Sequence, residues 1–297
     1  MTEHFADKLL AAIDAKGSPV CVGIDPVYDR LPEHVRKGQT SPDAQCEVVM
    51  RFCREVINAV APIVPAVKLQ SAYFEQLGDS GTGLYFLLAQ HARNKGLIVI
   101  GDVKRNDIGS TAEAYAAGHL LRADAPDAIT VNGYLGADGI TPFIDAAKKT
   151  GKGVFVLVRT SNASAATLQD IADANGVRLF EHVANMVAEL GDDATVGKRG
   201  YSLIGAVVGA TWPDEARRLR ELMPNQLFLV PGYGAQGASA ADCAASFKAD
   251  GTGAIVNASR SVLYPAADKR YADNRWPQAV AAAAQAFADD IAGALKP

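Results

Sequence analysis

The sequence has few cysteines, no long hydrophobic run and no excess of positive charge. Its four cysteines contain no C-x-x-C pair, which argues against a zinc ribbon or a dithiol redox motif and suits a reducing, cytoplasmic location. No apolar stretch approaches the roughly 18 residues of a membrane span. The N-terminal segment MTEHFADKLLAAIDAKG is predicted to be a mixed-charge amphipathic helix. It lacks the apolar core of a signal peptide.

The formal net charge of −4 argues against a nucleic-acid-binding surface, which would be basic. It is compatible with one bound phosphate, because a single arginine or lysine can hold that group. Histidine is scarce, and none of the five histidines falls at the end of a predicted strand. This placement argues against imidazole acid/base catalysis and against a histidine-rich metal site. No G-x-G-x-x-G follows the first strand, so a Rossmann dinucleotide site is unsupported.

Eight short apolar runs alternate with segments of helical periodicity, and we interpret each run as a strand. The predicted strands are Val20–Asp25, Ile63–Leu69, Leu97–Val103, Ala128–Asn132, Val154–Arg159, Leu203–Val208, Leu227–Val230 and Ala254–Asn257. Most are almost continuous Val, Ile and Leu, which is typical of parallel strands buried on both faces. Eight successive β–α units predict an α/β protein with a (β/α)8 TIM barrel. We expect residues 1–297 to form one domain with elaborated loops.

Two connections between these elements are unusually long. The first runs from Tyr28 to Asp43, and the second, from Thr160 to Tyr201, is predicted to contain a helix from Leu168 to Leu190. The pattern Ser110-x-x-Glu113 predicts a capping box that opens the helix after the third strand.

Polar residues follow most of the predicted strands, at the barrel end where TIM-barrel enzymes place their catalytic groups. A purely structural barrel needs no such set. The polar strand ends are Asp25, Lys68, Asp102 with Lys104, Asn132, Arg159 through Ser161, and Arg260.

The strongest signal is the cluster Asp102-x-Lys104-x-x-Asp107. Strand periodicity places Asp102 and Lys104 on one face, where their opposite charges keep both ionised. Lys68, at the end of the preceding strand, can reach the same acid. The alternative is a structural ion pair, a helix N-terminal acid and a lysine that extends from a strand end toward water. Burying an ion pair contributes little net stability, because the cost of removing both charges from water offsets their attraction. This balance favours a functional role for the cluster over a structural one.

The last two strands lead into segments that suit a bound anion. The seventh strand runs into the glycine-rich stretch Pro231–Gly237, and Arg260 follows the eighth. Barrels often bind phosphate with these two loops, through exposed backbone N–H groups and a basic side chain. A glycine-rich turn alone is weak support, because turns need glycine in any case.

Several stretches together resemble the orotidine 5′-monophosphate decarboxylase family, in the longer form (type 2) found in many bacteria. The resemblance covers nearly the whole chain, and the Asp-x-Lys-x-x-Asp element is its most specific part. The matching stretches are VGIDP at 22–26, Val67–Lys68, Asp102-x-Lys104-x-x-Asp107, Thr160–Ser161–Asn162, Pro231–Gly232 through Gln236–Gly237, and Ser259–Arg260.

The resemblance implies roles at the reacting end of the substrate, orotidine 5′-monophosphate. Lys104 would be the proton donor to C6 of the pyrimidine, and Asp102 would lie beside the departing carboxylate. Lys68 would bridge that acid and the ribose hydroxyls. Asp107 and Thr111 would be lent to the partner's site across a homodimer interface.

The resemblance also implies contacts farther from the reacting carbon. Asp25 would bind the ribose, and Ser161 the edge of the pyrimidine, although Thr160 could replace Ser161 because a long insertion follows. Gln236, Gly237 and Arg260 would bind the phosphate. The implied reaction yields uridine 5′-monophosphate and CO2 with no metal and no cofactor.

Two other functions stay open. One is a Mg²⁺-dependent sugar-phosphate decarboxylase or lyase of the same barrel superfamily, and the other is an inactive nucleotide-binding barrel. The first typically has an acid at the end of the second strand, where this sequence has Lys68, and a second cation there would repel Mg²⁺.

Overall fold

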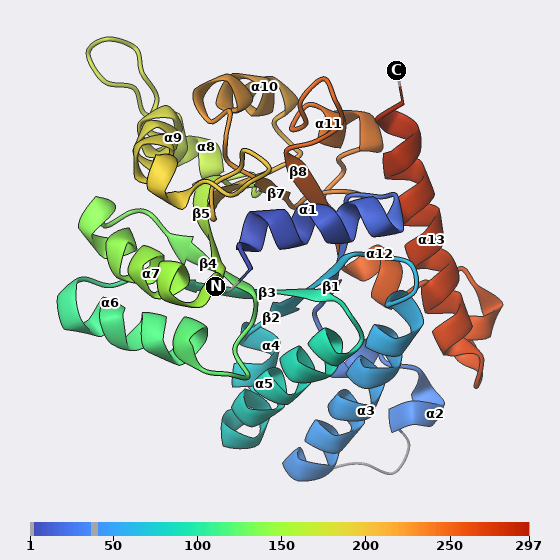
Figure 1. Ribbon diagram of the computed structural model, residues 1–297. Coiled ribbons are helices and arrows are strands. Elements are labelled where there is room, and N and C mark those ends of the chain that lie inside the picture. The colour runs from blue at the N-terminus through green and yellow to red at the C-terminus, as the bar shows by residue number, and fades with distance from the viewer. Residues whose placement is uncertain (1–2, 37–40, 297) are drawn as a thin grey trace.

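A closed barrel of eight parallel strands forms the centre of the molecule (Figure 1). The computed structural model describes residues 3–36 and 41–296. Each strand pairs with the next one in sequence, and β8 closes the barrel against β1. The predicted (β/α)8 fold is therefore confirmed. The strands are β1 (Val20–Ile24), β2 (Ala66–Gln70), β3 (Ile98–Arg105), β4 (Ala128–Asn132), β5 (Gly153–Arg159), β6 (Ile204–Val208), β7 (Phe228–Val230) and β8 (Ala254–Ala258).

The strand ends differ from the prediction at two informative places. β2 begins at Ala66 instead of Ile63, because the amides of Ile63 and Val64 both donate back to the carbonyl of Val60 and close a helical turn. β3 continues past the predicted end at Val103 to Arg105 and so includes Lys104.

Helices surround the barrel on all sides in Figure 1. The α-helices are α1 (Phe5–Lys16), α2 (Glu33–Arg36), α3 (Pro42–Val60), α4 (Ala72–Glu75), α5 (Gly78–Asn94), α6 (Gly109–Ala116), α7 (Ala137–Thr150), α8 (Ala165–Gln169), α9 (Leu179–Leu190), α10 (Pro213–Leu222), α11 (Ala240–Ala244), α12 (Arg260–Leu263) and α13 (Trp276–Ala294). Shorter turns are η1 (Tyr28–Arg30), the π-helical η2 (Ala117–Leu121), η3 (Asp193–Thr195) and η4 (Lys269–Ala272).

Helix α1 lies across one end of the barrel and closes it (Figure 1). Its buried side chains Phe5 and Leu9 belong to the same apolar cluster as Ile100, Phe155 and other residues of the barrel interior. The ring of Phe5 packs edge-on against Phe155 with centroids 5.8 Å apart. A Cβ at Gly153 would lie 2.2 Å from the Phe5 ring, so glycine at the start of β5 makes room for this plug. The opposite, carboxyl end of the strands is thereby the open one.

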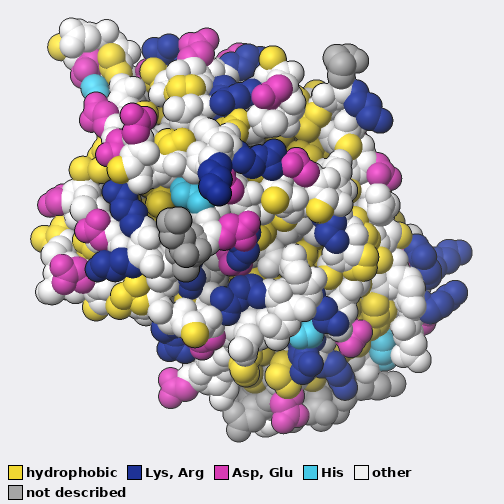
Figure 2. Space-filling model, in the orientation of Figure 1, with side chains coloured by type: hydrophobic (Ala, Val, Ile, Leu, Met, Phe, Trp, Pro, Cys, Tyr) yellow, Lys and Arg dark blue, Asp and Glu magenta, His cyan; other side chains and the backbone are white. Residues whose placement is uncertain are grey.

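The surface around α1 carries both signs of charge in an interspersed pattern (Figure 2).

A second and larger apolar cluster lies between the outer faces of the strands and the surrounding helices, and Phe52, Phe143 and Phe228 are fully buried in it. All four cysteines are free of disulfides, and Cys21, Cys53 and Cys243 are buried.

Two expectations about helices are wrong. The predicted single helix from Leu168 to Leu190 is two helices, α8 and α9, separated by a turn whose Asp173 carboxylate accepts from the amides of Asn175 and Val177. The predicted capping box is absent: α6 begins after Ile108, and no side chain caps it. Gly109, with φ of +52°, provides the turn into that helix instead.

The long connection after β1 contains η1 and α2 before α3 begins. The part of this predicted elaboration at 37–40, and the first two residues of the predicted N-terminal helix, lie outside the described residues.

Candidate active site

A cavity of about 430 Å³ opens at the carboxyl end of the barrel, opposite α1. Its size lies within the roughly 300–1,000 Å³ typical of small-molecule sites. Apolar side chains of Leu157, Val207 and Leu229 form part of its lining, and polar side chains from several strands project into it. It includes all of these predicted site residues: Asp25, Lys68, Asp102, Lys104, Ser161, Gln236 and Arg260.

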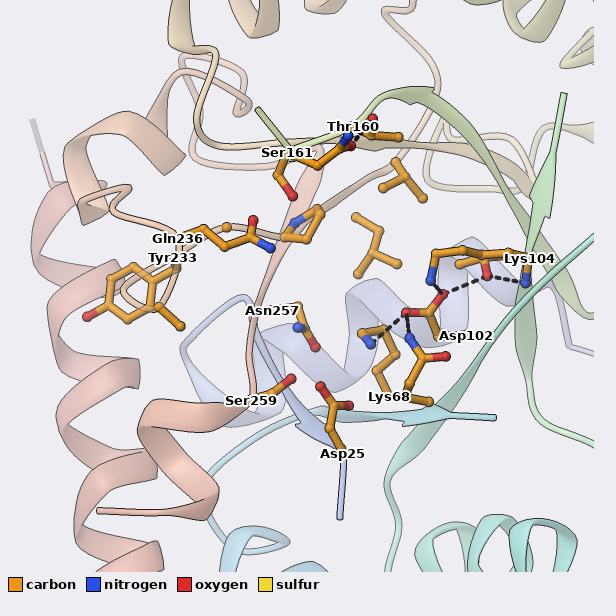
Figure 3. Close-up of a pocket in the computed structure, with 18 of the residues that line it drawn as sticks. Asp25, Lys68, Asp102, Lys104, Thr160, Ser161, Tyr233, Gln236, Asn257 and Ser259 are labelled. Carbon is orange, nitrogen blue, oxygen red and sulfur yellow. Dashed lines mark hydrogen bonds and ion pairs between the residues drawn. The ribbon is translucent and has the colours of Figure 1, made fainter. Parts of the chain in front are cut away.

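The carboxylate of Asp102 is the centre of a hydrogen-bonded cluster on one side of this cavity (Figure 3). Its Oδ2 accepts from Lys68 Nζ at 2.8 Å and from Gln70 Nε2 at 2.9 Å. Its Oδ1 accepts from Lys104 Nζ at 2.5 Å and from Thr130 Oγ1 at 2.9 Å. Four donors thus fill the accepting capacity of a carboxylate.

Burial and charge act in opposite directions on this cluster. Burial alone would raise the pKa of Asp102, but the ammonium groups of Lys68 and Lys104 hold it well below the usual range of a carboxyl. Burial would likewise lower the pKa of Lys68, yet the negative charges of Asp102 and Asp25 raise it. At neutral pH the cluster therefore contains a charged lysine at position 68 and a charged aspartate at position 102.

A local irregularity of β3 brings Lys104 to the cluster. The pairing of β3 with β4 shifts register between Gly101 and Arg105, and Lys104 has a φ of +45°, the left-handed region that side chains other than glycine rarely adopt. The Lys104 amide donates to Thr130 Oγ1 at 3.0 Å, which holds this conformation. Asp102 and Lys104 do meet, as expected, but through this bulge in place of a regular strand.

The other side of the cavity differs from the Asp102 cluster in its hydrogen bonding. Six of the polar side chains on this side make no hydrogen bond to another protein group among the described residues, unlike Thr160, Asn162 and Tyr233. A ligand can therefore bind to them without displacing an internal partner. These side chains belong to Asp25, Ser161, Gln236, Asn257, Ser259 and Arg260.

Thr160 and Ser161 lie next to each other at the end of β5, but only one hydroxyl is engaged. The Thr160 hydroxyl donates to Asn162 Oδ1 and accepts from Gln169 Nε2, both at 2.7 Å. The Thr160 carbonyl also accepts from Trp212 Nε1 at 3.0 Å. Ser161 Oγ has no such partner within the described chain and lines the cavity. This geometry favours Ser161 over Thr160 as the ligand contact.

Three predicted site residues do not line the cavity of this single chain: Asp107, Thr111 and Gly237. The Asp107 carboxylate accepts from the amide of Ile108 at 2.8 Å, and Thr111 is exposed on α6.

Two of the polar strand ends, Arg159 and Asn132, do not line the cavity. Arg159 is fully buried outside the cavity, stacked on the Trp212 ring and ion-paired to Asp170 at 2.8 Å. The register of β5 shifts at Leu157–Arg159, and such a bulge redirects the side chains that follow it. Asn132 Oδ1 instead accepts from the Tyr134 amide and closes a turn.

Sequence reasoning missed four residues that line the cavity. Gln70 had a usable signal, because it lies two residues after Lys68 and hence on the same face of β2. Asn257 also had a signal, because it is the polar last residue of the predicted strand Ala254–Asn257. Thr130 and Tyr233 had none, since threonine is common in strands and Tyr233 lies in a segment interpreted as a turn.

Metal-ligand clusters and membrane-spanning helices are both absent from the described residues. Within residues 3–36 and 41–296, no three His, Cys, Asp or Glu side chains come together in a group that could hold a metal ion. No helix in the same part of the chain has the length and apolar character needed to cross a bilayer.

The parallel barrel, with a lysine–carboxylate–lysine cluster around the buried Asp102 at its open end, defines a TIM-barrel enzyme. A family model described as orotidine 5′-phosphate decarboxylase / HUMPS family matches residues 18–274. The chain belongs to this family, as the sequence resemblance predicted.

Relatives and solved structures agree with this assignment. The chain is 42% identical to the orotidine 5′-phosphate decarboxylase of Rhodopirellula baltica, over 97% of this chain and 99% of that one. It is 41% identical to the protein of the same name from Deinococcus radiodurans, over 99% of each chain. The solved structure of Leishmania donovani OMP decarboxylase is 30% identical, covers 98% of this chain and 99% of its own, and superposes with a TM-score of 0.75.

Proposed function

We propose that the chain is an orotidine-5′-phosphate decarboxylase, a carboxy-lyase of pyrimidine biosynthesis that converts orotidine 5′-monophosphate to uridine 5′-monophosphate and CO2. The observation that carries this proposal is the Asp102 cluster, with Lys68 and Lys104 on either side of one carboxylate. Full-length similarity to enzymes named for this activity supports it.

Charge placement explains the chemistry. The bond from C6 of the pyrimidine to the carboxylate breaks, CO2 leaves, and the electron pair stays on C6. The ammonium of Lys104 stabilises this charge and donates a proton to C6, which completes uridine monophosphate. Asp102 remains ionised because of its lysine partners, and its charge beside the substrate carboxylate disfavours the bound ground state. Lys104 then regains a proton from water.

Lys104 is suited to this role by its exposure. Its side chain is 46% exposed at the cavity, whereas that of Lys68 is 6% exposed. Lys104 can therefore move between Asp102 and a bound substrate, while Lys68 stays in place and keeps Asp102 charged.

The remaining polar side chains bind the parts of the substrate that do not react. Asp25 and Lys68 bind the ribose, and Ser161 binds the pyrimidine edge. Gln236 and Arg260, with the backbone at Gly237, bind the phosphate. Because the phosphate is remote from C6, its binding energy can organise the site for the reaction.

We further propose a homodimer in which each subunit lends Asp107 and Thr111 to the partner's site. Both residues lie outside the cavity of their own chain. Leu135, an exposed apolar residue, lies near Asp107, because a Cβ at Gly139 would be 3.2 Å from both the Asp107 carbonyl oxygen and Leu135 Cβ. Exposed apolar patches of this kind mark interaction surfaces. The exposed apolar residues of the loops and helix after β3 and β4 are Ile108, Tyr115, Tyr134 and Leu135.

Two organisational statements also belong to the proposal. Residues 1–297 form one domain, which is supported by a single barrel whose strands span residues 20–258 and by terminal helices that both pack on it. The enzyme is cytoplasmic, which is supported by four cysteines that form no disulfide.

The direct test is the loss of orotidine monophosphate absorbance with purified protein in excess EDTA. Undiminished turnover is expected, because the proposed chemistry uses only protein side chains. Activity that EDTA abolishes would instead favour the Mg²⁺-dependent relatives. Tight uridine monophosphate binding without any turnover would identify an inactive nucleotide-binding barrel.

A further inference from the structure

Three polar side chains meet on the cavity wall formed by β1 and β8. Asn257 lies at the carboxyl end of β8, Ser259 follows it, and Asp25 follows β1; Figure 3 shows their polar atoms pointing toward one another. All three line the cavity.

Two of these groups are buried acceptors without a donor. Asn257 is 7% exposed, and its Oδ1 has no hydrogen-bond partner among the described residues. Asp25 Oδ1 is also buried and has no hydrogen-bond partner among the described residues. Leaving a buried acceptor unpaired is unfavourable, because the group loses its hydrogen bonds to water and gains none in return. Placing two of them on one cavity wall therefore points to a ligand that brings donors.

Gly23 shows how closely this wall is packed. A Cβ at Gly23 would lie 2.0 Å from Ser259 Oγ and 3.2 Å from Asn257 Oδ1. Because Gly23 has no side chain, Asn257 and Ser259 can pack directly against the β1 backbone, close to Asp25. The negative charge of Asp25 helps to raise the pKa of the nearby Lys68, so this wall lies next to the Asp102 cluster.

We propose that Asn257 is a substrate-binding residue that acts with Asp25 to bind the 2′,3′-diol of the ribose. A vicinal diol presents two O–H donors a short distance apart, and Asp25 Oδ1 and Asn257 Oδ1 are two acceptors that need them. Asp25 can only accept when ionised, whereas the amide of Asn257 also offers N–H donors to a hydroxyl oxygen. This inference rests on the proposed nucleotide substrate and adds a specificity determinant for ribose over deoxyribose.

Binding of product analogues tests this contact independently of catalysis. Dissociation constants for uridine monophosphate and its 2′-deoxy and 3′-deoxy analogues would be measured by calorimetry. For the wild-type enzyme, removing the hydroxyl that Asn257 contacts is expected to weaken binding about tenfold. In Asn257→Ala that ratio is expected to fall close to one, because the contact is already missing.

A second variant and a control make the result decisive. Asn257→Leu keeps the number and branching of the side-chain non-hydrogen atoms, so it leaves no cavity of the kind that alanine leaves, and it is expected to lose the same discrimination. Asn132→Ala removes an asparagine at the end of another strand, outside the cavity, and is expected to keep the wild-type ratio.

Two outcomes would overturn the inference: wild-type enzyme that binds all three nucleotides equally, or Asn257 variants that keep both wild-type ratios. The latter result would mean that a buried water satisfies Asn257. Turnover of orotidine monophosphate, measured on the same preparations, separates the two proposals. Wild-type enzyme without turnover refutes the decarboxylase assignment, while the binding ratios still decide the role of Asn257.

Discussion

Lys68 and Lys104 donate to opposite oxygens of the same carboxylate, yet they have different physical roles. Lys68 is 5% exposed and is itself stabilised by Asp102, so it belongs to the framework of the site. Lys104 is exposed at the cavity and is free to approach a ligand. A substitution at each position should therefore separate catalysis from stability.

The first prediction concerns Lys104→Ala. Turnover is expected to fall by roughly 10⁴-fold, the upper end for a general acid, because in the proposed mechanism this ammonium both donates the proton and stabilises the charge on C6. The free energy of unfolding should change by less than about 1 kcal/mol, since exposed ion pairs contribute little. Steady-state kinetics and urea unfolding measure the two effects. Near-normal turnover would refute the role of Lys104. Lys148→Ala, which removes an exposed lysine on α7, is the matched control and is expected to keep wild-type turnover.

The backbone at Lys104 adds an internal check. With φ of +45°, a side chain at this position is strained, and only glycine adopts this conformation freely. Lys104→Gly is therefore expected to be about 1 kcal/mol more stable than Lys104→Ala, although both lack the ammonium. Equal stability would mean that the bulge relaxes when the lysine is removed.

The second prediction concerns Asp102→Asn, which leaves Lys68 buried without its counter-ion. Breaking a buried pair in this way is expected to lower the free energy of unfolding by roughly 3–5 kcal/mol at pH 7. Urea unfolding measures it, with Asp124→Asn in an exposed pair as the control. An Asp102→Asn enzyme as stable as the wild type would contradict the assigned burial of charge.

The pH dependence of this difference follows from the two pKa shifts. The lowered pKa of Asp102 means that its stabilisation is complete above the unfolded pKa of about 4 and is lost as the pH falls. The raised pKa of Lys68 means that its stabilisation is complete below the unfolded pKa of about 10.4 and is lost as the pH rises. The gap between wild type and Asp102→Asn should thus be widest between about pH 4 and 10.

At the scale of elements, the insertion after β5 orders the strand end that lines the cavity. Gln169, the last residue of α8, accepts from the Thr160 amide at 3.1 Å and donates to the Thr160 hydroxyl. Asp170, directly after α8, pairs with the buried guanidinium of Arg159. The insertion thereby occupies Thr160 and leaves Ser161 available to the substrate.

The third prediction tests this ordering with Gln169→Ala. The KM for orotidine monophosphate is expected to rise several-fold, on the order of one lost hydrogen bond, with little change in kcat. The reason is that the proposed pyrimidine contact of Ser161 is loosened while the Asp102 cluster is unchanged. Gln285→Ala on the exposed face of α13 is the control. An unchanged KM would show that β5 holds Ser161 without the insertion.

At the scale of the whole molecule, one chain completes the Asp102 cluster but not the full set of predicted site residues. Asp107 and Thr111 follow β3 outside the cavity, next to exposed Ile108 and Tyr115. A second copy of the chain, placed against this surface by two-fold symmetry, could reach the cavity with both residues.

The fourth prediction is subunit complementation. Lys104→Ala and Asp107→Ala are each expected to be nearly inactive, but a mixed dimer contains one site with both residues intact. Random exchange of subunits in equal amounts should restore about a quarter of wild-type activity, since half of the dimers are mixed and each has one good site. No recovery, with mixed dimers verified by mass spectrometry, would place Asp107 in its own subunit's site.

Much of this protein follows from sequence alone, because the pattern that predicts it is local. Runs of four to seven residues that are rich in Val, Ile and Leu predict buried parallel strands, and β4 has the predicted limits. The spacing of Asp102, Lys104 and Asp107 identified the cluster and the family before any coordinates. Glycine, proline and short polar motifs were less informative, as the missing capping box at Ser110 shows.

Only the tertiary structure decided which side chains meet. Two strand bulges bring Lys104 to Asp102 and turn Arg159 away from the cavity, and neither bulge has a sequence signature. Gln169 engages Thr160 from an insertion, and Asn257 faces Asp25 from the other end of the chain. Such contacts depend on register and on packing between distant segments. Sequence therefore determined the barrel and its charged cluster, while folding determined the partners of each side chain.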